Sequence, residues 1–322
     1  MRILCLVLLS ALVALASAAW GADIPFAAIR DAEVRLATIG YRLATANAAL
    51  CDVQRPGTGL QLHTLAQYQP EAREQARRFF GFEGPIAVEG VAPDSPAAQA
   101  GVAADDTVVA INGAPLALPS TPTGTAMLIA AEQQLASLPS AAPLTLTLRR
   151  DGRERTLRIA PVPQCRSRFE LLISDRWEAS ADGDMVQVAS RFLELGDEAA
   201  TVIVAHELAH NILRHPARLR AARAGSGVLA EFGRSARLYR RTEDEADVLS
   251  VYLLANAGFD PMAGARFWRG RGKSIGGGLL RGRSHASPAE RARMMEDAAR
   301  AVGATALRPA TSPLIVTRDQ PL

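Results

Sequence analysis

Apolar positions recur at a helical period along three stretches of this 322-residue chain. In the first, Ile29, Leu36, Leu43 and Leu50 follow one another at intervals of seven residues. Such spacing places their side chains on one side of a helix, as a single apolar seam. The pattern predicts one N-terminal helix, within residues 23–51, whose seam packs against the body of the protein.

The other two helical stretches are Thr201–His215 and Leu238–Ala257. The first is apolar on most sides, which predicts a buried helix, and Asp197 is expected to cap its start. The second stretch ends at Gly258, and the Asp-Pro pair that follows is a helix stop signal. Two long helices are therefore expected near the middle of the chain.

Residues 52–163 carry a different pattern, in which short apolar runs are separated by Gly, Pro and Ser. This punctuation predicts short strands joined by turns. Leu144, Leu146 and Leu148 alternate with polar residues and lead into an Asp-Gly pair, which favours a tight hairpin turn. We therefore expect a β-rich domain between the helical parts of the chain.

The N-terminus has the organisation of a secretory signal peptide over residues 1–18. A positive start precedes an apolar run, and Ala-Ser-Ala supplies a small-residue cleavage site. The sequence thus predicts an exported, periplasmic protein. An uncleaved N-terminal membrane anchor is the alternative, because the apolar run approaches the length that a bilayer requires. No later run is long and apolar enough to span a membrane, so no integral membrane domain is expected after cleavage.

The net charge of +3 comes mostly from arginine. No stripe of basic and aromatic residues accompanies it, so we expect no nucleic-acid partner. Several arginines between residues 214 and 241 surround a Gly-Ser-Gly sequence, which indicates a solvated connection; a cover over the cleft and peripheral contact with anionic lipid are the alternatives. Outside the leader, Cys51 and Cys165 are the only cysteines and bracket the β-rich segment, so export favours a disulfide between them. Zinc ligation and two unpaired buried thiols are the alternatives.

The helix of residues 201–215 carries the candidate chemistry, in the sequence HELAH. His206 and His210 are four residues apart and therefore share a helix face, about 5–6 Å apart at Cβ, where one metal ion can bridge them. Glu207 is placed to take a proton from a metal-bound water, as in zinc peptidases. A satisfied structural cluster in the core is the alternative. His215 lies off the shared face and is expected to have a supporting role.

A third ligand is expected from the following helix. Glu243 and Asp247 are again four residues apart on a face that continues with apolar residues. We assign Glu243 as the ligand and Asp247 as the carboxylate that accepts the second N–H of a zinc-bound histidine. The neighbouring Asp244 and Glu245 are expected to be solvated.

With HELAH, EDEAD and AGFDP in this order, the chain resembles the M48 family of metallopeptidases. The resemblance implies that His206, His210 and Glu243 hold one Zn²⁺ and that Glu207 is the general base. A late motif of the family is matched by HASPAER, with alanine where proline is usual. It implies that His285 and Arg291 face the metal as transition-state stabilisers, or that His285 occludes the zinc, as in some periplasmic members.

The sequence VEGVAPDSPAAQAGVAADDTVVAING, residues 88–113, resembles the core of a PDZ domain. The resemblance implies a groove beside a helix at Ala126–Leu138, in which a peptide adds as a strand with its C-terminal carboxylate held by backbone N–H groups. Gly57, Gly59 and Leu60 form the candidate carboxylate loop, and a plain surface turn is the alternative.

Together these features predict an α+β fold. A mainly helical zincin-type peptidase domain, residues 166–302, contains a small β-sheet with strands at Phe169–Ile173 and Met185–Val188. It is interrupted by the PDZ-like domain and followed by a flexible tail, residues 303–322. The predicted function is an exported zinc endopeptidase that cleaves misfolded or envelope proteins by means of a Glu207-activated, zinc-bound water.

Two other functions remain open at this point. The first is a latent metallopeptidase fold that acts as a PDZ-mediated peptide-binding adaptor or chaperone. The second is an intramembrane site-2-type protease, which the lack of several membrane spans argues against.

Overall fold

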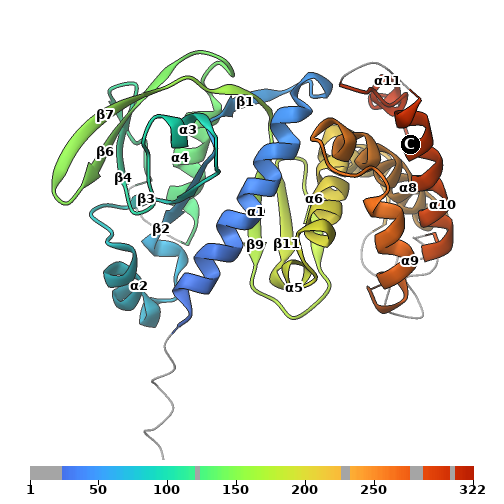
Figure 1. The fold of residues 1–322 in the computed structure, drawn as a ribbon, viewed down its shortest axis with the longest axis horizontal. Coiled ribbons are helices and arrows are strands. Elements are labelled where there is room, and N and C mark those ends of the chain that lie inside the picture. Colours follow the sequence, from blue (N-terminus) through green and yellow to red (C-terminus); the bar gives the residue numbers. More distant parts are fainter. Residues whose placement is uncertain (1–23, 120–123, 226–232, 276–285, 305–308) are drawn as a thin grey trace, which may run out of the picture.

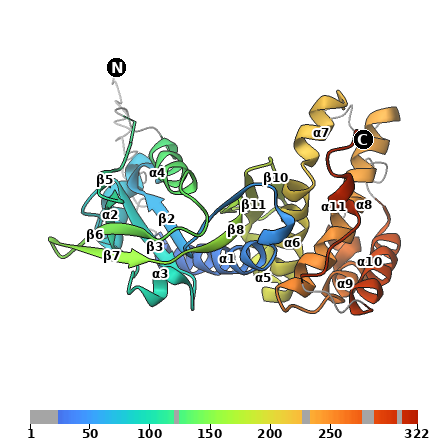
Figure 2. The same cartoon turned by 90° about the horizontal axis from the view of Figure 1, so that it is seen from above.

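The computed structural model describes residues 24–119, 124–225, 233–275, 286–304 and 309–322. The described chain forms a β-rich domain and a mainly helical body, with helix α1 between them (Figures 1 and 2). None of the helices in the described ranges is both long and apolar enough to cross a membrane.

Helix α1 (Phe26–Ala46) ends in a 3-10 turn at Ala48–Leu50. Its seam follows the prediction, since Leu36, Leu43 and Leu50 are buried. The helix packs closely on both of its neighbours. Gly40 of α1 leaves no room for a side chain beside Phe169 of the body, and Gly90 of the β-rich domain leaves none beside Val34 of α1. Helix α1 therefore lies between the β-rich domain and the helical body and packs directly against both.

The β-rich domain is an antiparallel sheet with the strand order β2-β3-β4-β6-β7, and β5 pairs with β4. The strands are β2 (Leu60–Thr64), β3 (Ile86–Val91), β4 (Thr107–Ile111), β5 (Ala114–Pro115), β6 (Leu144–Arg150) and β7 (Arg153–Ile159). The predicted hairpin is the β6–β7 pair, with Leu144, Leu146 and Leu148 buried. Three helices belong to the domain: α2 (Arg73–Phe80), α3 (Pro96–Gln99) and α4 (Ala126–Ala136). The sequence analysis did not predict α2.

A narrow neck joins this domain to the body. Strand β1 (Gln54–Gly57) pairs antiparallel with β8 (Val162–Cys165), so the chain enters and leaves the domain side by side. The predicted disulfide between Cys51 and Cys165 closes the neck at its base, with the two Cα atoms 5.4 Å apart.

The body combines a three-stranded sheet with a layer of helices. The sheet has the order β10-β11-β9, with β9 and β11 parallel. Its strands are β9 (Arg168–Leu172), β10 (Ala179–Ala181) and β11 (Met185–Ala189). The helices are α5 (Ser190–Glu194), α6 (Asp197–Ile212), α7 (His215–Ala221), α8 (Gly233–Asn256), α9 (Ala263–Ile275) and α10 (Pro288–Gly303).

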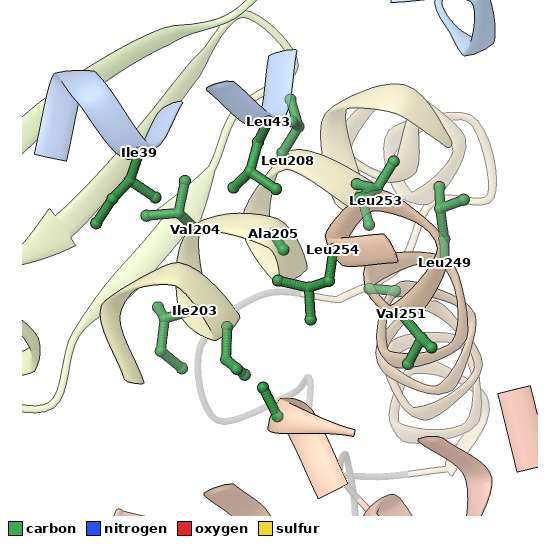
Figure 3. Packing of buried hydrophobic residues seen from close by; sticks show 14 of the residues in the cluster. Ile39, Leu43, Ile203, Val204, Ala205, Leu208, Leu249, Val251, Leu253 and Leu254 are labelled. Carbon is green, nitrogen blue, oxygen red and sulfur yellow. The ribbon is translucent and has the colours of Figure 1, made fainter. Parts of the chain in front are cut away.

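Helices α1, α6 and α8 share one apolar core (Figure 3). It includes Leu43 from α1, Val204 and Leu208 from α6, and Leu249 and Leu253 from α8, all fully or almost fully buried. This packing fixes α6 against α8, the two helices on which the candidate ligands were predicted.

Two expectations about chain ends differ from the structure. Asp197 does not cap α6; Gly196, whose φ of 97° suits glycine, precedes the helix, and Asp197 is its first residue. The C-terminal segment, predicted as a flexible tail, packs on the body over residues 309–322. Buried Ala310 donates its backbone N–H to the Asn256 side chain, and Arg318 donates to the Leu50 carbonyl. The amino-acid composition of the segment gave no indication of these buried polar contacts.

Candidate metal centre and peptide groove

Helix packing gathers His206, His210 and Glu243 into one cluster. His206 and His210 lie one helical turn apart on α6, and their Nε2 atoms are 3.1 Å apart. Glu243 approaches from α8, with its carboxylate oxygens 3.3 Å from His206 Nε2 and 3.4 Å from His210 Nε2. All three side chains are at least largely buried.

These separations suit a zinc ion. Zinc binds histidine nitrogen and carboxylate oxygen at about 2.0–2.2 Å in tetrahedral geometry, which places neighbouring ligand atoms roughly 3.3 Å from each other. Each imidazole nitrogen is 3.3–3.4 Å from one of the two Glu243 oxygens, and one donor atom from each residue lies within 4.8 Å of the other two, which is compatible with a shared metal ion. The same three residues are those that the sequence assigned as ligands.

Asp247 supports the cluster from behind. Its Oδ1 atom lies 3.0 Å from His206 Nδ1, which orients the ring so that Nε2 faces the cluster. Arg291 of α10 donates two hydrogen bonds to the same carboxylate, at 2.5 and 2.6 Å, and stacks on the Trp268 ring at 3.6 Å. Arg291 is thus engaged with Asp247, although the sequence assigned it to stabilising the transition state.

The electrostatics of the two histidines differ. Burial lowers the pKa of His210 to about 3. Burial acts in the same direction on His206, but the carboxylates of Asp247 and Glu243 outweigh it and raise the pKa of His206 to about 10. The carboxylates of Asp247 and Glu243 therefore place negative charge next to His206, which favours a cation at this position.

A pocket of about 510 Å³ opens beside the cluster. His206, Glu207 and Glu243 line one side of it, and Trp177 and Ala179 line another. Ala179 belongs to β10, the outer strand of the sheet, which pairs with β11 among the described strands. Glu207 is thus placed at the wall of a pocket large enough for an extended polypeptide segment, next to a strand edge.

His215 was expected to support the ligands, and it does contact one of them. Its Nδ1 lies 2.9 Å from His210 Nδ1, and its Nε2 lies 3.1 Å from Glu245. Glu245 was predicted to be solvated, but it is largely buried and also accepts hydrogen bonds from Arg218 and Arg241. The prediction failed because α7 folds back and brings Arg218 onto α8.

The structure describes only part of the late motif HASPAER. His285 lies outside the described residues. After it, Ser287 and Glu290 form a reciprocal cap at the start of α10, and this cap sets the direction in which Arg291 enters the site.

A second, separate recess lies in the β-rich domain, between β2 and α4. Gly59 and Leu60 of the predicted carboxylate loop line it, and Gly57 lies beside it at the end of β1. Gly59 has a φ of 79°, and Leu60 donates its backbone N–H to the Thr58 hydroxyl. We call this recess the β2–α4 groove; Glu132 and Leu135 of α4 form its other side.

Comparisons with known proteins bear on this domain. The sequence model for the PDZ domain matches residues 88–138, so the chain contains a PDZ domain. Similar solved structures include "HtrA-type protease AlgW with decapeptide", with 19% sequence identity and a TM-score of 0.26, covering 34% of this chain and 30% of that chain. Another is the HtrA3 PDZ domain bound to the phage-derived ligand FGRWV, with 23% identity and a TM-score of 0.26, covering 34% of this chain and 88% of that chain. No curated protein matches the chain.

Proposed function

We propose that the protein is an exported, zinc-dependent endopeptidase of the M48 type that cleaves misfolded or envelope proteins. Its PDZ domain binds peptide segments of substrates or partners. One observation carries the proposal: two imidazole nitrogens and a carboxylate meet at 3.1–3.4 Å in the wall of a pocket.

His206, His210 and Glu243 would hold the zinc, a set of three protein ligands that is usual for catalytic zinc sites. A bound zinc ion supplies Lewis acidity: it polarises a carbonyl group and lowers the pKa of water to about 7. Asp247 accepts the Nδ1–H of His206 and so keeps the Nε2 lone pair directed at the metal.

Glu207 acts as the general base in this proposal. It follows His206 on α6 and lines the same pocket, so it can accept the proton of the attacking water and pass it to the leaving amine. Arg291 holds Asp247 in place, and His285 is the candidate for stabilising the oxyanion.

The edge of β10 offers a way to bind many sequences. An extended substrate that adds as a further strand would be held by backbone hydrogen bonds, whatever its side chains. Because Ala179 of β10 lines the metal pocket, such a strand would bring its carbonyl groups towards Glu207.

The decisive experiment replaces the base and keeps the ligands. Glu207→Gln should retain one zinc per chain, measured by atomic emission, and lose at least a hundredfold of its casein-cleaving rate. Glu198→Gln is the matched control, because Glu198 is on the same helix and faces Arg266 at the surface. Undiminished cleavage by Glu207→Gln would end the proposal.

A PDZ-mediated adaptor that has kept a latent peptidase fold is the second candidate. The presence of the PDZ domain favours it, since that domain binds peptides in its own right. Casein cleavage by the purified protein, with and without His285→Ala, distinguishes the two. An adaptor would be inactive in both forms. A peptidase that uses His285 to stabilise the oxyanion would lose activity in the variant, and one occluded by His285 would gain it.

A further inference from the structure

We infer that the body of this chain closes the peptide groove of its own PDZ domain, so that peptide binding and docking of the domain on the body exclude each other. The inference rests on the PDZ part of the proposed function and is independent of the metal. Its first support is the composition of the β2–α4 groove, which is lined from four sides.

Two of those sides belong to the PDZ domain. Strand β2 is the outer strand of its sheet, and α4 runs beside it, so an added peptide would lie between them. Arg55 on β1 lies near the loop of Gly59 and Leu60, which is where a terminal carboxylate is expected.

The other two sides belong to α1 and to the body. Ala37 and Tyr41 of α1, together with Arg168 and Phe169 of β9, complete the lining of the same recess. The space that remains is about 50 Å³. Ligand pockets are typically about 300–1,000 Å³, so the recess as it stands is too small to receive a peptide.

A specific ion pair holds this arrangement. Arg168 on β9 donates to Glu132 on α4 at 3.2 Å, and both side chains are largely buried. Burial raises the pKa of Glu132, while the nearby Arg55 and Arg168 act against this shift. Arg55 and Arg168 are both near the Glu132 carboxylate, so separation of the groove from β9 would remove one of two cations and leave a place for another beside Glu132.

This requirement defines the ligand class. The peptide that displaces the body should have a free C-terminal carboxylate and, among its last few residues, a Lys or Arg that replaces Arg168 beside Glu132. Opening of the groove must also separate the domain from α1, where Val34 packs against Gly90 of β3; the two-stranded neck, β1 with β8, is the connection that would remain.

The test uses the full-length chain in a Glu207→Gln background, so that peptides are not cleaved. Arg168→Gln removes the closing charge, and Arg166→Gln is the matched control, since Arg166 pairs with Asp184 outside the groove. The probe is a pool of labelled heptapeptides, randomised at the last five positions, with free C-termini. A second pool has amidated C-termini.

We expect Arg168→Gln to retain the free-carboxylate pool about tenfold more than the parent and the Arg166→Gln control, because the binding-competent fraction rises. The retained peptides should be enriched in Lys and Arg, and the amidated pool should show no difference. Equal retention by all three chains, including none by any of them, would overturn the inference.

A second measurement does not depend on any ligand. Leu135→Cys places a thiol in the groove, where its reaction with a maleimide reports access. Labelling should be slow in the parent and about tenfold faster with Arg168→Gln. Rapid labelling in the parent would show that the groove is open and would also overturn the inference.

Discussion

His215 and His210 are hydrogen-bonded through their Nδ1 atoms, which lie 2.9 Å apart. A histidine that binds zinc through Nε2 carries its proton on Nδ1, so His210 is the donor and His215 the acceptor. His215 then donates its Nε2–H to Glu245. Burial lowers the pKa of His215, which keeps its ring neutral and able to accept.

This chain of contacts predicts that His215 positions His210. His215→Ala should weaken zinc binding by about 10–100-fold, as expected when the hydrogen-bond partner of a ligand is lost. The zinc dissociation constant can be measured by competition with a chromophoric chelator. Arg241→Ala, which removes an exposed partner of Glu245, is the control and should change affinity little. Unchanged affinity in a folded His215→Ala protein would contradict the assignment.

The Asp247–Arg291 pair predicts a large effect on stability. Asp247→Ala would leave the buried guanidinium of Arg291 without its carboxylate, which costs about 3–5 kcal/mol. Asp297→Ala is a useful comparison, because it breaks an exposed pair with Arg300 and should cost less than about 1 kcal/mol. Urea unfolding of both variants measures the difference, and equal effects would refute the buried-charge argument.

The disulfide predicts sensitivity to reductant. Cys51 and Cys165 are 114 residues apart in sequence, and closing a loop of that size stabilises the folded state by about 5 kcal/mol in the chain-entropy model. A reductant should therefore lower the urea midpoint of the wild-type protein. It should have no effect on the Cys51→Ser, Cys165→Ser double variant, whose midpoint should already be low.

Two glutamates at the boundary between α1 and the PDZ domain predict a dependence on pH. Glu33 of α1 and Glu89 of β3 lie close enough for their carboxyl groups to interact, and burial raises the pKa of both. The folded protein therefore keeps protons that the unfolded chain releases above about pH 4.5. Stability should fall as pH rises from there towards the folded pKa, by at most about 1.4 kcal/mol per pH unit for each proton.

Replacing one of the pair should weaken this dependence. Glu33→Gln keeps a hydrogen-bonding group without a titrating proton, so the variant should gain stability over the wild type between pH 4 and pH 8. Urea midpoints measured across this range test the sign. A difference that is constant with pH would show that the pair does not titrate in this interval.

The pairs within the candidate metal cluster could be predicted because their geometry is local to one helix. A spacing of four residues fixes which side chains share a helix face, and this holds for His206 with His210 and for Glu243 with Asp247. The PDZ signature is similarly local. Asp105, in the turn before β4, has a positive φ of 69°, a conformation that Asp adopts more readily than most residues.

The remaining contacts depend on how helices and strands that are distant in the sequence pack against one another. Arg214 has a φ of 56°, which breaks the helix after α6 and turns His215 back towards His210. The expectation from the sequence counted residues along a continuous helix and therefore placed His215 too far from the ligands. The position of Glu245 depends on α7, and the closure of the groove depends on β9 meeting α4. The apolar periodicity within one segment does not show which other helix or strand that segment will contact.

The neck also makes the PDZ domain separable in principle. Because the chain departs and returns at Cα atoms only 5.4 Å apart, evolution or a protein engineer can exchange or excise everything between Cys51 and Cys165 without rerouting the remaining polypeptide. Removal of the domain would expose the side of α1 that packs against it, and another protein surface would have to cover that side. A module grafted in this way can acquire a different ligand preference while the histidines on α6 stay where they are.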